Sequence, residues 1–175
     1  AIFKKDLTFM NKLSNILKPL SILPALCMMC LIFSFSGQTS KESANLSGGI
    51  SYKVVSFVNT LTGNTWEKTD VELYAKKWEN PIRKLAHVTE YFVLALTVSL
   101  PLYTYGIRNK YLFLLTILIC VCFAASDEYH QSFVAGRGPS VKDVGIDSIG
   151  VLLETFVSGV GLKLLIFLIR TEKGS

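Results

Sequence analysis

The stretch that decides the fold is residues 111–126, YLFLLTILICVCFAAS, in which no side chain is charged. Comparable apolar blocks recur at about 19–36, 82–103 and 143–169. A helix of about 20 apolar residues, rising ~1.5 Å per residue, is long enough to cross the ~30 Å hydrocarbon core of a bilayer. The sequence therefore predicts an all-α, polytopic membrane protein with about four transmembrane helices, the third of them at 111–129.

The overall composition agrees with this fold class. Hydrophobic residues make up 50% of the 175 residues, and the mean hydropathy is +0.42, which is more apolar than an ordinary soluble domain. A formal charge of +5 would suggest nucleic acid in a soluble protein, but in a membrane protein Lys and Arg instead set the orientation. We expect a single membrane domain over residues 1–175 with no nucleic-acid partner.

The first span is preceded by a basic segment, residues 1–18, whose apolar residues recur at helical spacing. This pattern predicts an amphipathic helix on the membrane surface rather than a cleaved signal peptide. Pro19 begins the span, and Pro24 is expected to kink it. Cys27 and Cys30 have the spacing of a redox or metal pair, but with no other ligands nearby they are interpreted as small apolar residues, and no disulfide is expected.

A long polar segment, residues 37–80, follows the first span. Thr39 and Glu42 fit a helix-capping box. This cap would begin one amphipathic helix of the segment. A second, short amphipathic helix is predicted to end before Pro81, because proline interrupts helical hydrogen bonding. These interfacial helices would cover one face of the membrane domain.

The distribution of basic residues predicts the orientation. The N-terminal segment, the 104–110 loop and the C-terminus are basic with few acids, so the positive-inside rule places all three, and both termini, in the cytoplasm. The 37–80 segment and the 130–142 loop would then lie outside. There, Trp66 and Trp78 are expected to anchor the interfacial helices.

Ionisable groups gather where three predicted spans meet the outer face. A charge in mid-membrane costs roughly 3 kcal/mol or more, so such groups usually pair, face the bundle interior or do chemistry. At the start of the second span, Arg83, His87 and Glu90 lie within ~60° of one another on a helix. Lys84 and Tyr91 flank this stripe.

The end of the third span carries Asp127 and Gln131, an i, i+4 pair on one helix face. Asp127 and Glu128 would repel each other, so either one is protonated or a cation lies close. The Gly-rich turn that follows presents Arg137, whose guanidinium suits a phosphate or carboxylate. Arg137 could equally pair with Asp127 or Asp143.

The fourth span begins with Asp143 and Asp147 on one stripe with Gly150 and Glu154. Gly150 is expected to allow close approach of another helix, and Asp143 can favour the helix N-terminus. Six of the polar side chains could also supply ligands for a divalent ion, although their spacing matches no known metal motif: His87, Glu90, Asp127, Glu128, Asp143 and Asp147.

Three interpretations of this polar cluster remain open at this point. It could be an internal salt-bridge network that holds the helices in register, a ligand-binding or catalytic site, or part of a transport or proton-relay path. A path would require polar residues in the cytoplasmic half, where few occur apart from Glu154 and Lys163.

The polar residues also occur in a recognisable order. The first span ends Phe33-Ser34-Phe35-Ser36-Gly37-Gln38, and the second opens Lys84-x-x-His87-x-x-Glu90-Tyr91. Asp127-Glu128-x-x-Gln131-x-Phe133 with Gly136-Arg137 follows the third, and Asp143-x-x-x-Asp147-x-x-Gly150 opens the fourth. Over about residues 30–165 this order resembles the VanZ family.

The resemblance implies a membrane protein of the bacterial cell envelope that is associated with teicoplanin resistance. We expect it in the bacterial cytoplasmic membrane, binding or modifying a lipid-linked cell-wall component, or the lipoglycopeptide itself, at the outer leaflet. A non-enzymatic structural protein or a small transporter is the alternative, and whether the protein is an enzyme stays open. The candidate catalytic residues are His87, Glu90, Asp127 and Glu128, and the candidate binding residues are Lys84, Gln131, Arg137, Asp143, Asp147, Ser36 and Gln38.

Overall fold

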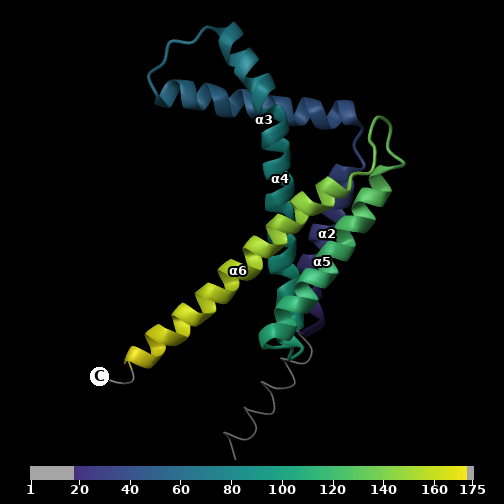
Figure 1. Ribbon diagram of the computed structural model, residues 1–175, viewed down its shortest axis with the longest axis vertical. Helices are drawn as coiled ribbons and strands as arrows, with labels where there is room; N and C mark the ends of the chain where they lie inside the picture. The colour runs from purple at the N-terminus through teal and green to yellow at the C-terminus, as the bar shows by residue number, and fades with distance from the viewer. Residues whose placement is uncertain (1–17, 173–175) are drawn as a thin grey trace, which may run out of the picture.

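The structure is a computed structural model that describes residues 18–172, with side-chain surroundings described as far as residue 161. The predicted N-terminal amphipathic helix at 1–18 lies outside the described residues, except for Lys18. Within the described part the chain folds into one short 3-10 helix and five α-helices (Figure 1). In chain order they are η1 (Lys18–Ile22), α2 (Leu23–Ser36), α3 (Ser40–Leu61), α4 (Lys68–Thr104), α5 (Asn109–Gln131) and α6 (Val141–Glu172).

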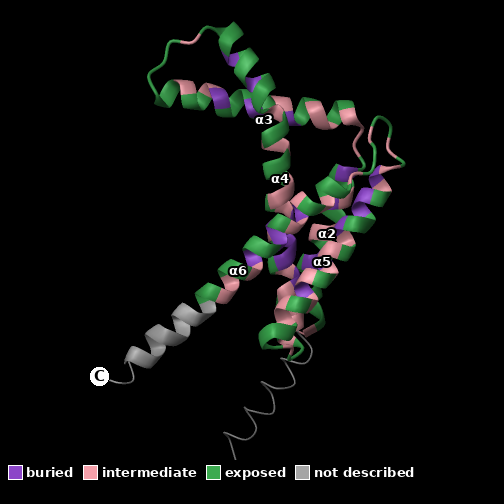
Figure 2. Ribbon diagram, viewed as in Figure 1, coloured by how far each residue is buried: buried purple, intermediate pink, exposed green. Residues whose placement is uncertain are grey.

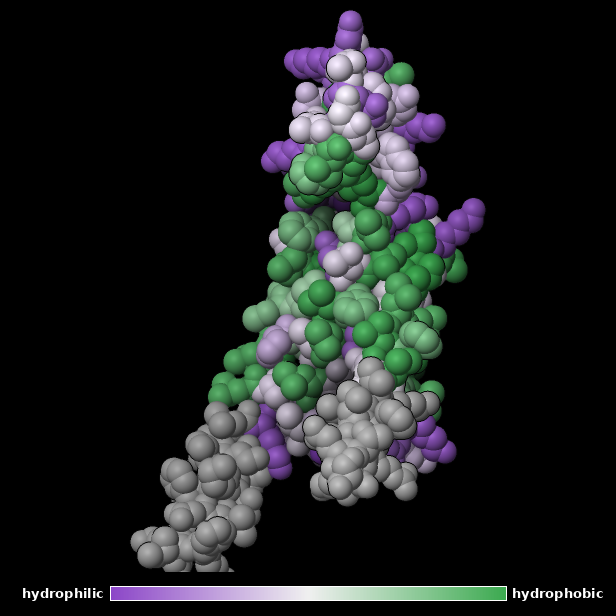
Figure 3. Space-filling model, turned by 90° about the vertical axis from the view of Figure 1, so that its left-hand side faces the viewer, coloured by the Kyte–Doolittle hydropathy of each residue, from purple (hydrophilic) through white to green (hydrophobic). Residues whose placement is uncertain are grey.

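Four helical stretches are long and apolar enough to cross a membrane, which confirms the predicted fold class. They are Lys18–Ser36, Lys68–Thr104, Asn109–Gln131 and Val141–Gly161. Figure 3 shows an apolar belt around their middle, with hydrophilic side chains concentrated above it. The chain is therefore a multi-pass membrane protein.

The outside of the spanning bundle is apolar, as contact with lipid requires. Leu114 and Leu118 on α5 and Phe156 on α6 are each more than half exposed, and Figure 2 shows buried residues confined to the faces where the helices meet. In water such exposure would cost about 25 cal/mol per Å² of apolar surface. In a bilayer the same surface is solvated by hydrocarbon.

One predicted helix boundary is wrong. The amphipathic helix expected to end before Pro81 continues through it, so that α4 runs unbroken from Lys68 to Thr104 with Pro81 and Pro101 inside. Pro81 removes one helical hydrogen bond, but its ring is exposed and the helix is packed on both sides of it. Val71 and Ala75 pack before the proline, and Tyr91 packs after it.

Pro24, which was predicted to kink the first span, lies close to the boundary between η1 and α2. It lies in the first turn of α2, just after η1, where the missing N–H group would have had no helical partner. At this end of the bundle the Ser21 and Thr104 hydroxyls are hydrogen-bonded to each other at 3.0 Å. The start of the first span therefore lies beside the end of the second.

The long polar segment forms an arm, which we define as α3 together with residues 68–81 of α4. The predicted capping box begins α3, since Thr39 accepts a hydrogen bond from the Glu42 N–H group and Glu42 accepts one from the Thr39 N–H group. In Figure 1, α3 runs across α4 at the opposite end of the molecule from the α4–α5 turn. Where the two helices cross, the buried Ser51 hydroxyl donates a 2.5 Å hydrogen bond to the Ala75 carbonyl.

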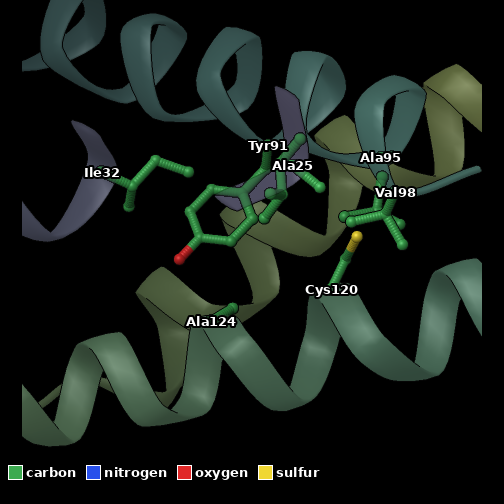
Figure 4. Close-up of a cluster of buried hydrophobic side chains, with 9 residues drawn as sticks. Ala25, Ile32, Tyr91, Ala95, Val98, Cys120 and Ala124 are labelled. Atoms are coloured by element: carbon green, nitrogen blue, oxygen red, sulfur yellow. The ribbon is translucent and has the colours of Figure 1, made fainter. Parts of the chain in front are cut away.

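The bundle core is small and apolar, and residues from four helices build it. Ile32 of α2, Tyr91 and Ala95 of α4, Ala124 of α5 and Val151 of α6 are fully buried. In Figure 4 the Tyr91 ring reaches from α4 into the space between Ile32 and Ala124. Small residues on α4 and α5 allow the helices to approach closely, the usual means of packing in a membrane.

Gly150 allows another helix to approach closely, as the sequence predicted, and among the described glycines it has the nearest neighbours. A Cβ atom built on Gly150 would lie 2.1 Å from the Val88 carbonyl oxygen and 3.0 Å from the Phe92 nitrogen. The backbone of α6 thus lies directly on the backbone of α4. This crossing places the start of α6, with Asp143 and Asp147, beside the His87 turn of α4.

Candidate functional site

A polar cavity of about 390 Å³ opens where the arm meets the bundle. We call it the face cavity. Four helices and the α5–α6 turn contribute to its wall, so it exists only in the folded chain. Its lining residues are Ser40, Ser43, Asn80, Arg83, Lys84, His87, Glu128, Gln131, Gly136, Arg137, Gly138, Ser140, Lys142 and Asp143.

Four cations line the face cavity, namely Arg83, Lys84, Arg137 and Lys142. Arg83 donates a 3.1 Å hydrogen bond to the Asn80 side-chain oxygen, one turn earlier on α4. Among the described residues, no carboxylate lies within 4.0 Å of any of the four cations. The positive charge is therefore available to a ligand in the cavity.

Arg137 is held in place by an amide rather than by an acid. Its Nη1 donates a 2.8 Å hydrogen bond to the Gln131 side-chain oxygen. Of the two alternatives left open by the sequence, direct pairing with Asp127 or Asp143 is therefore not the one adopted. Burial, followed by the charge of Arg83, lowers the pKa of the Arg137 guanidinium, while Asp127 and Glu128 act in the opposite direction. Arg137 thus lies between a cation and two acids without a direct ion pair.

Beneath the cavity a buried hydrogen-bond network joins α2 to the end of α5. The Ser36 hydroxyl donates to Asp127 Oδ2 at 2.7 Å, and Gln131 Nε2 donates to the same oxygen at 3.1 Å. Ser36 is 2% exposed and Asp127 1% exposed. With Arg137 above it, the network connects the surface cation to the bundle interior, and it places Asp127 and Gln131 on one face as predicted.

The adjacent carboxylates of Asp127 and Glu128 diverge. Asp127 faces Ser36 and Gln131, whereas Glu128 Oε1 accepts a 3.1 Å hydrogen bond from the Ser140 N–H group in the α5–α6 turn. Separate partners relieve the repulsion expected between neighbouring acids. Glu128 also fixes the turn that carries Arg137.

A second acidic group surrounds His87, whose Nδ1 lies 3.7 Å from Glu90 Oε2 and 3.8 Å from Asp147 Oδ1. These distances are longer than hydrogen bonds, and His87 Nδ1 is buried without a hydrogen-bond partner among the described residues. Asp147 is only 4% exposed. The imidazole thus lies between carboxylates of two different helices, Glu90 of α4 and Asp147 of α6.

Besides His87 Nδ1, the described part of the chain has five buried polar side-chain atoms without a hydrogen-bond partner: one each on Asn59, Thr116 and His130, and two that lie close to the site. These two are the Tyr91 hydroxyl, on a fully buried side chain, and Asp127 Oδ1. Unpaired buried polar atoms are costly, so they commonly mark sites that hold water, ions or ligands. Both belong to the layer directly under the face cavity.

A smaller cavity of about 190 Å³ adjoins the face cavity, and we call it the side cavity. Phe35, Leu46, Ile50 and Ile82 give it a largely apolar wall. Gln38 and Glu90 also line it, and four residues are common to both cavities: Ser43, Arg83, His87 and Arg137.

The described residues contain no group of three or more His, Cys, Asp or Glu side chains arranged to hold a metal ion. The six potential metal ligands are divided between the His87 group, the Asp127 network and the cavity wall. All four cysteines are free, with Cys27 and Cys30 exposed on the outside of the bundle.

The family can now be assigned. Comparison with protein families matches residues 21–161 to the VanZ/LLP1 family. The chain belongs to the VanZ/LLP1 family. Searches of curated proteins and of solved structures gave no significant match. The resemblance to VanZ seen in the sequence is confirmed, and the matched region contains both cavities and every residue that lines them.

Within the VanZ/LLP1 domain, the predicted site residues occupy three positions. Ser36, Asp127 and Asp147 are buried below the cavities, and Gln38 and Glu90 line the side cavity. The remaining predicted residues line the face cavity: Lys84, His87, Glu128, Gln131, Arg137 and Asp143. All eleven lie at the same end of the bundle.

Sequence reasoning missed several residues of the face cavity. Ser40, Ser43 and Asn80 were interpreted only as parts of the polar segment 37–80, and Lys142 only as part of the 130–142 loop. None of these residues belongs to a motif. Serine and asparagine are also common at helix ends, so their presence there does not indicate a site. Only the crossing of α3 over α4 reveals their position.

Proposed function

We propose that this VanZ/LLP1 protein binds a lipid-linked component of the cell envelope through an anionic headgroup held in the face cavity. The observation that carries the proposal is the set of four lining cations without an ion pair among the described residues. Arginine and lysine recognise phosphate by charge-assisted hydrogen bonds. A mono- or diphosphate headgroup carries the negative charge that these cations would pair with. A neutral sugar headgroup carries no such charge.

The charges around Arg137 support an anionic ligand. Burial and the neighbouring Arg83 lower the pKa of Arg137, which means that the charged guanidinium is less stable there than in water. A phosphate between the two arginines would offset both effects, since each cation would then interact with a negative charge.

The side cavity supports an amphiphilic ligand. Because Ser43, Arg83, His87 and Arg137 line both cavities, a headgroup in the face cavity lies directly beside an apolar wall. That wall can take the first part of the hydrocarbon chain. The combination of a charged and an apolar compartment favours a lipid over a soluble anion.

The residues predicted as catalytic receive different roles in this proposal. His87 and Glu128 line the face cavity: His87 would contact the headgroup, and Glu128 would hold the α5–α6 turn through its hydrogen bond with the Ser140 N–H group. Glu90 and Asp127 lie deeper and would hold His87 and Gln131 in place through the contacts described above. If the ligand is modified as well as bound, His87 with Glu90 is the acid–base pair within reach of it.

We further propose that the face cavity opens to the outer leaflet of a bacterial cytoplasmic membrane, with both termini in the cytoplasm, and that binding there reduces sensitivity to teicoplanin. The basic 104–110 loop lies at the opposite end of the bundle from the arm, as the positive-inside rule requires for this orientation.

Binding can be tested with purified protein in a neutral detergent. Dodecyl phosphate and dodecanol share a chain and differ in the headgroup, so calorimetric titration should detect binding of the phosphate alone. The double variant Arg83→Gln/Arg137→Gln should weaken that binding by about tenfold or more, corresponding to one or two lost charge-assisted hydrogen bonds. Lys110→Gln, at the opposite end of the bundle, is the matched control and should bind normally.

Equal affinity for dodecanol, or unchanged affinity in the double variant, would contradict the proposal. In cells, expression of the wild-type chain should raise the teicoplanin concentration needed to stop growth of a sensitive bacterium. The double variant at equal membrane abundance should lose this protection, and the Lys110→Gln control should keep it.

A further inference from the structure

A third hollow in the molecule lies under the arm, and its lining is apolar. It shares no residue with the face cavity, and it shares Ile82 with the side cavity. It is a groove of about 360 Å³ between α3 and α4, and we call it the apolar groove. Val54, Val55 and Val58 of α3 form one wall, while Trp78 and Leu85 of α4 form part of the other. In Figure 3, apolar side chains below the polar tip of the arm continue towards the belt of the bundle.

Large apolar side chains are exposed in the groove, at Leu85, and on α3 beyond its lining residues, at Phe57 and Leu61. Phe57 and Leu61 on α3 are 62% and 68% exposed, and Leu85 on α4 is 64% exposed. The small core of the arm, Val55, Val71 and Ala75, leaves them uncovered. An apolar surface of this extent marks a contact with another molecule or with a membrane.

Aromatic residues at the groove are those that favour the membrane interface. Trp66 stacks on Tyr74 with ring centroids 4.7 Å apart and an interplanar angle of 26°, and Trp78 is 53% exposed. Tryptophan and tyrosine concentrate where hydrocarbon meets headgroups, since one end of each ring system is polar and the other apolar.

The groove is continuous with a membrane-spanning helix. Ile82 and Leu85, at its lower edge, belong to the same unbroken α4 that crosses the membrane. Exposed lysines flank the groove on both helices, including Lys53 on α3 and Lys76 and Lys77 on α4. Lysines in this position suit the phosphates of a lipid surface.

We infer that the apolar groove is occupied by acyl chains of membrane phospholipids, so that the arm lies in the interfacial layer instead of projecting into water. The occupant is hydrocarbon of the surrounding leaflet, and the site is separate from the face cavity. The proposal explains why α3 can expose Phe57 and Leu61, and why α4 continues through Pro81 with an apolar side.

The sequence contains two tryptophans, and both line the groove, so intrinsic tryptophan fluorescence reports on this site alone. The full chain is reconstituted in phosphatidylcholine vesicles with either ordinary or brominated acyl chains, bromine being a contact quencher. A several-fold loss of tryptophan emission is expected in the brominated vesicles, together with little quenching by aqueous iodide. Trp66→Phe and Trp78→Phe each leave one emitter, and both should be quenched.

Strong quenching by iodide without quenching by bromine would overturn the inference, because the arm would then stand in water. Absence of both kinds of quenching would overturn it as well, since a protein partner or a second copy of the chain would then cover the groove. Val58→Asp places a charge in the groove and should reduce bromine quenching. Thr60→Asp adds the same charge at an exposed position of α3 outside the groove and should not.

Discussion

Two helices cross α4, and they do so in different ways. At the bundle crossing, Gly150 brings the α6 backbone so close that a Cβ atom would lie 2.1 Å from the Val88 carbonyl oxygen. At the arm crossing, a Cβ on Gly48 would lie 4.0 Å from Glu79 Oε2, and one on Gly49 would have no neighbour within 4 Å. The bundle is thus held by direct backbone contact, whereas the arm rests on a few side chains such as Ser51.

This difference separates a part of the protein that its own helix contacts hold together, the bundle, from a part that depends on its surroundings, the arm. In a bilayer no hydrophobic effect drives helices together, so close backbone contact and buried hydrogen bonds must hold the bundle. At the arm crossing the contact is made by side chains, with Ser51 bonded to the Ala75 carbonyl and Val55 packed against α4, and the apolar surface that remains on the arm must be covered by its surroundings. Substitutions of the same kind at the two crossings should therefore have opposite effects.

The largest effect is expected from Gly150→Ala. The added methyl group collides with the α4 backbone, which cannot rotate away as a side chain could, and overpacking of this kind costs about 1–3 kcal/mol or more. Thermal unfolding followed by circular dichroism in detergent should show a clear drop in Tm. Gly145→Ala on the same helix, with nothing within 4 Å, is the control, and an equal drop in both variants would disprove the close crossing.

A smaller loss is expected from Asp127→Ala, in the network below the face cavity. The change leaves Ser36 and Gln131 without their common acceptor in a buried place, at a cost of about 1–3 kcal/mol. Asp127→Asn keeps an acceptor oxygen and should recover part of the lost Tm. If Asp127→Ala unfolds at the wild-type temperature, the network does not join α2 to α5 energetically.

At the arm crossing, Ser51→Ala should cost less. It removes the hydrogen bond to the Ala75 carbonyl, typically worth about 1 kcal/mol, and leaves the bundle intact. Hydrogen exchange should therefore become faster in α3 while α5 and α6 keep their protection. Faster exchange in the bundle would show that the two regions are not independent.

The smallest effect, and the only stabilising one, is expected from Gly49→Ala. Glycine inside a helix costs roughly 0.5–1 kcal/mol relative to alanine, and at this position the new methyl group meets open space. The protection of α3 amides should rise slightly in hydrogen exchange. Decreased protection of the α3 amides would mean that another part of the molecule contacts α3 at Gly49, and that α3 crosses α4 at a different position.

Sequence reasoning succeeded where one residue type has one physical consequence. The apolar blocks predicted the four spans, the Thr39–Glu42 spacing predicted the cap, and Gly150 predicted a close crossing. It failed at Pro81, where the local rule of helix interruption was outweighed by packing on both sides. No local rule contains that information.

The site was predicted in its location but not in its connections. Asp127, Gln131 and Arg137 were recognised as polar residues at one end of the bundle, but for Arg137 only an anionic ligand or an acid, Asp127 or Asp143, was considered as a partner. The structure pairs it with the Gln131 amide. Ser43, which lines both cavities, carries no signal in the sequence, because its importance comes from the path of α3 over α4.

The central claim, an outward-facing cavity that binds an anionic headgroup, is tested most directly by the reactivity of Ser43→Cys in intact cells. The reagent is a methanethiosulfonate that carries a sulfonate and does not cross membranes. Wild-type protein, whose cysteines all lie in the spans, gives the background, and Ser132→Cys, outside both cavities, is the control. We predict that the Ser43→Cys variant reacts in intact cells and that dodecyl phosphate, but not dodecanol, slows the reaction at this position only. Reaction only after the membrane is permeabilised, or a rate that dodecyl phosphate leaves unchanged, would contradict the claim.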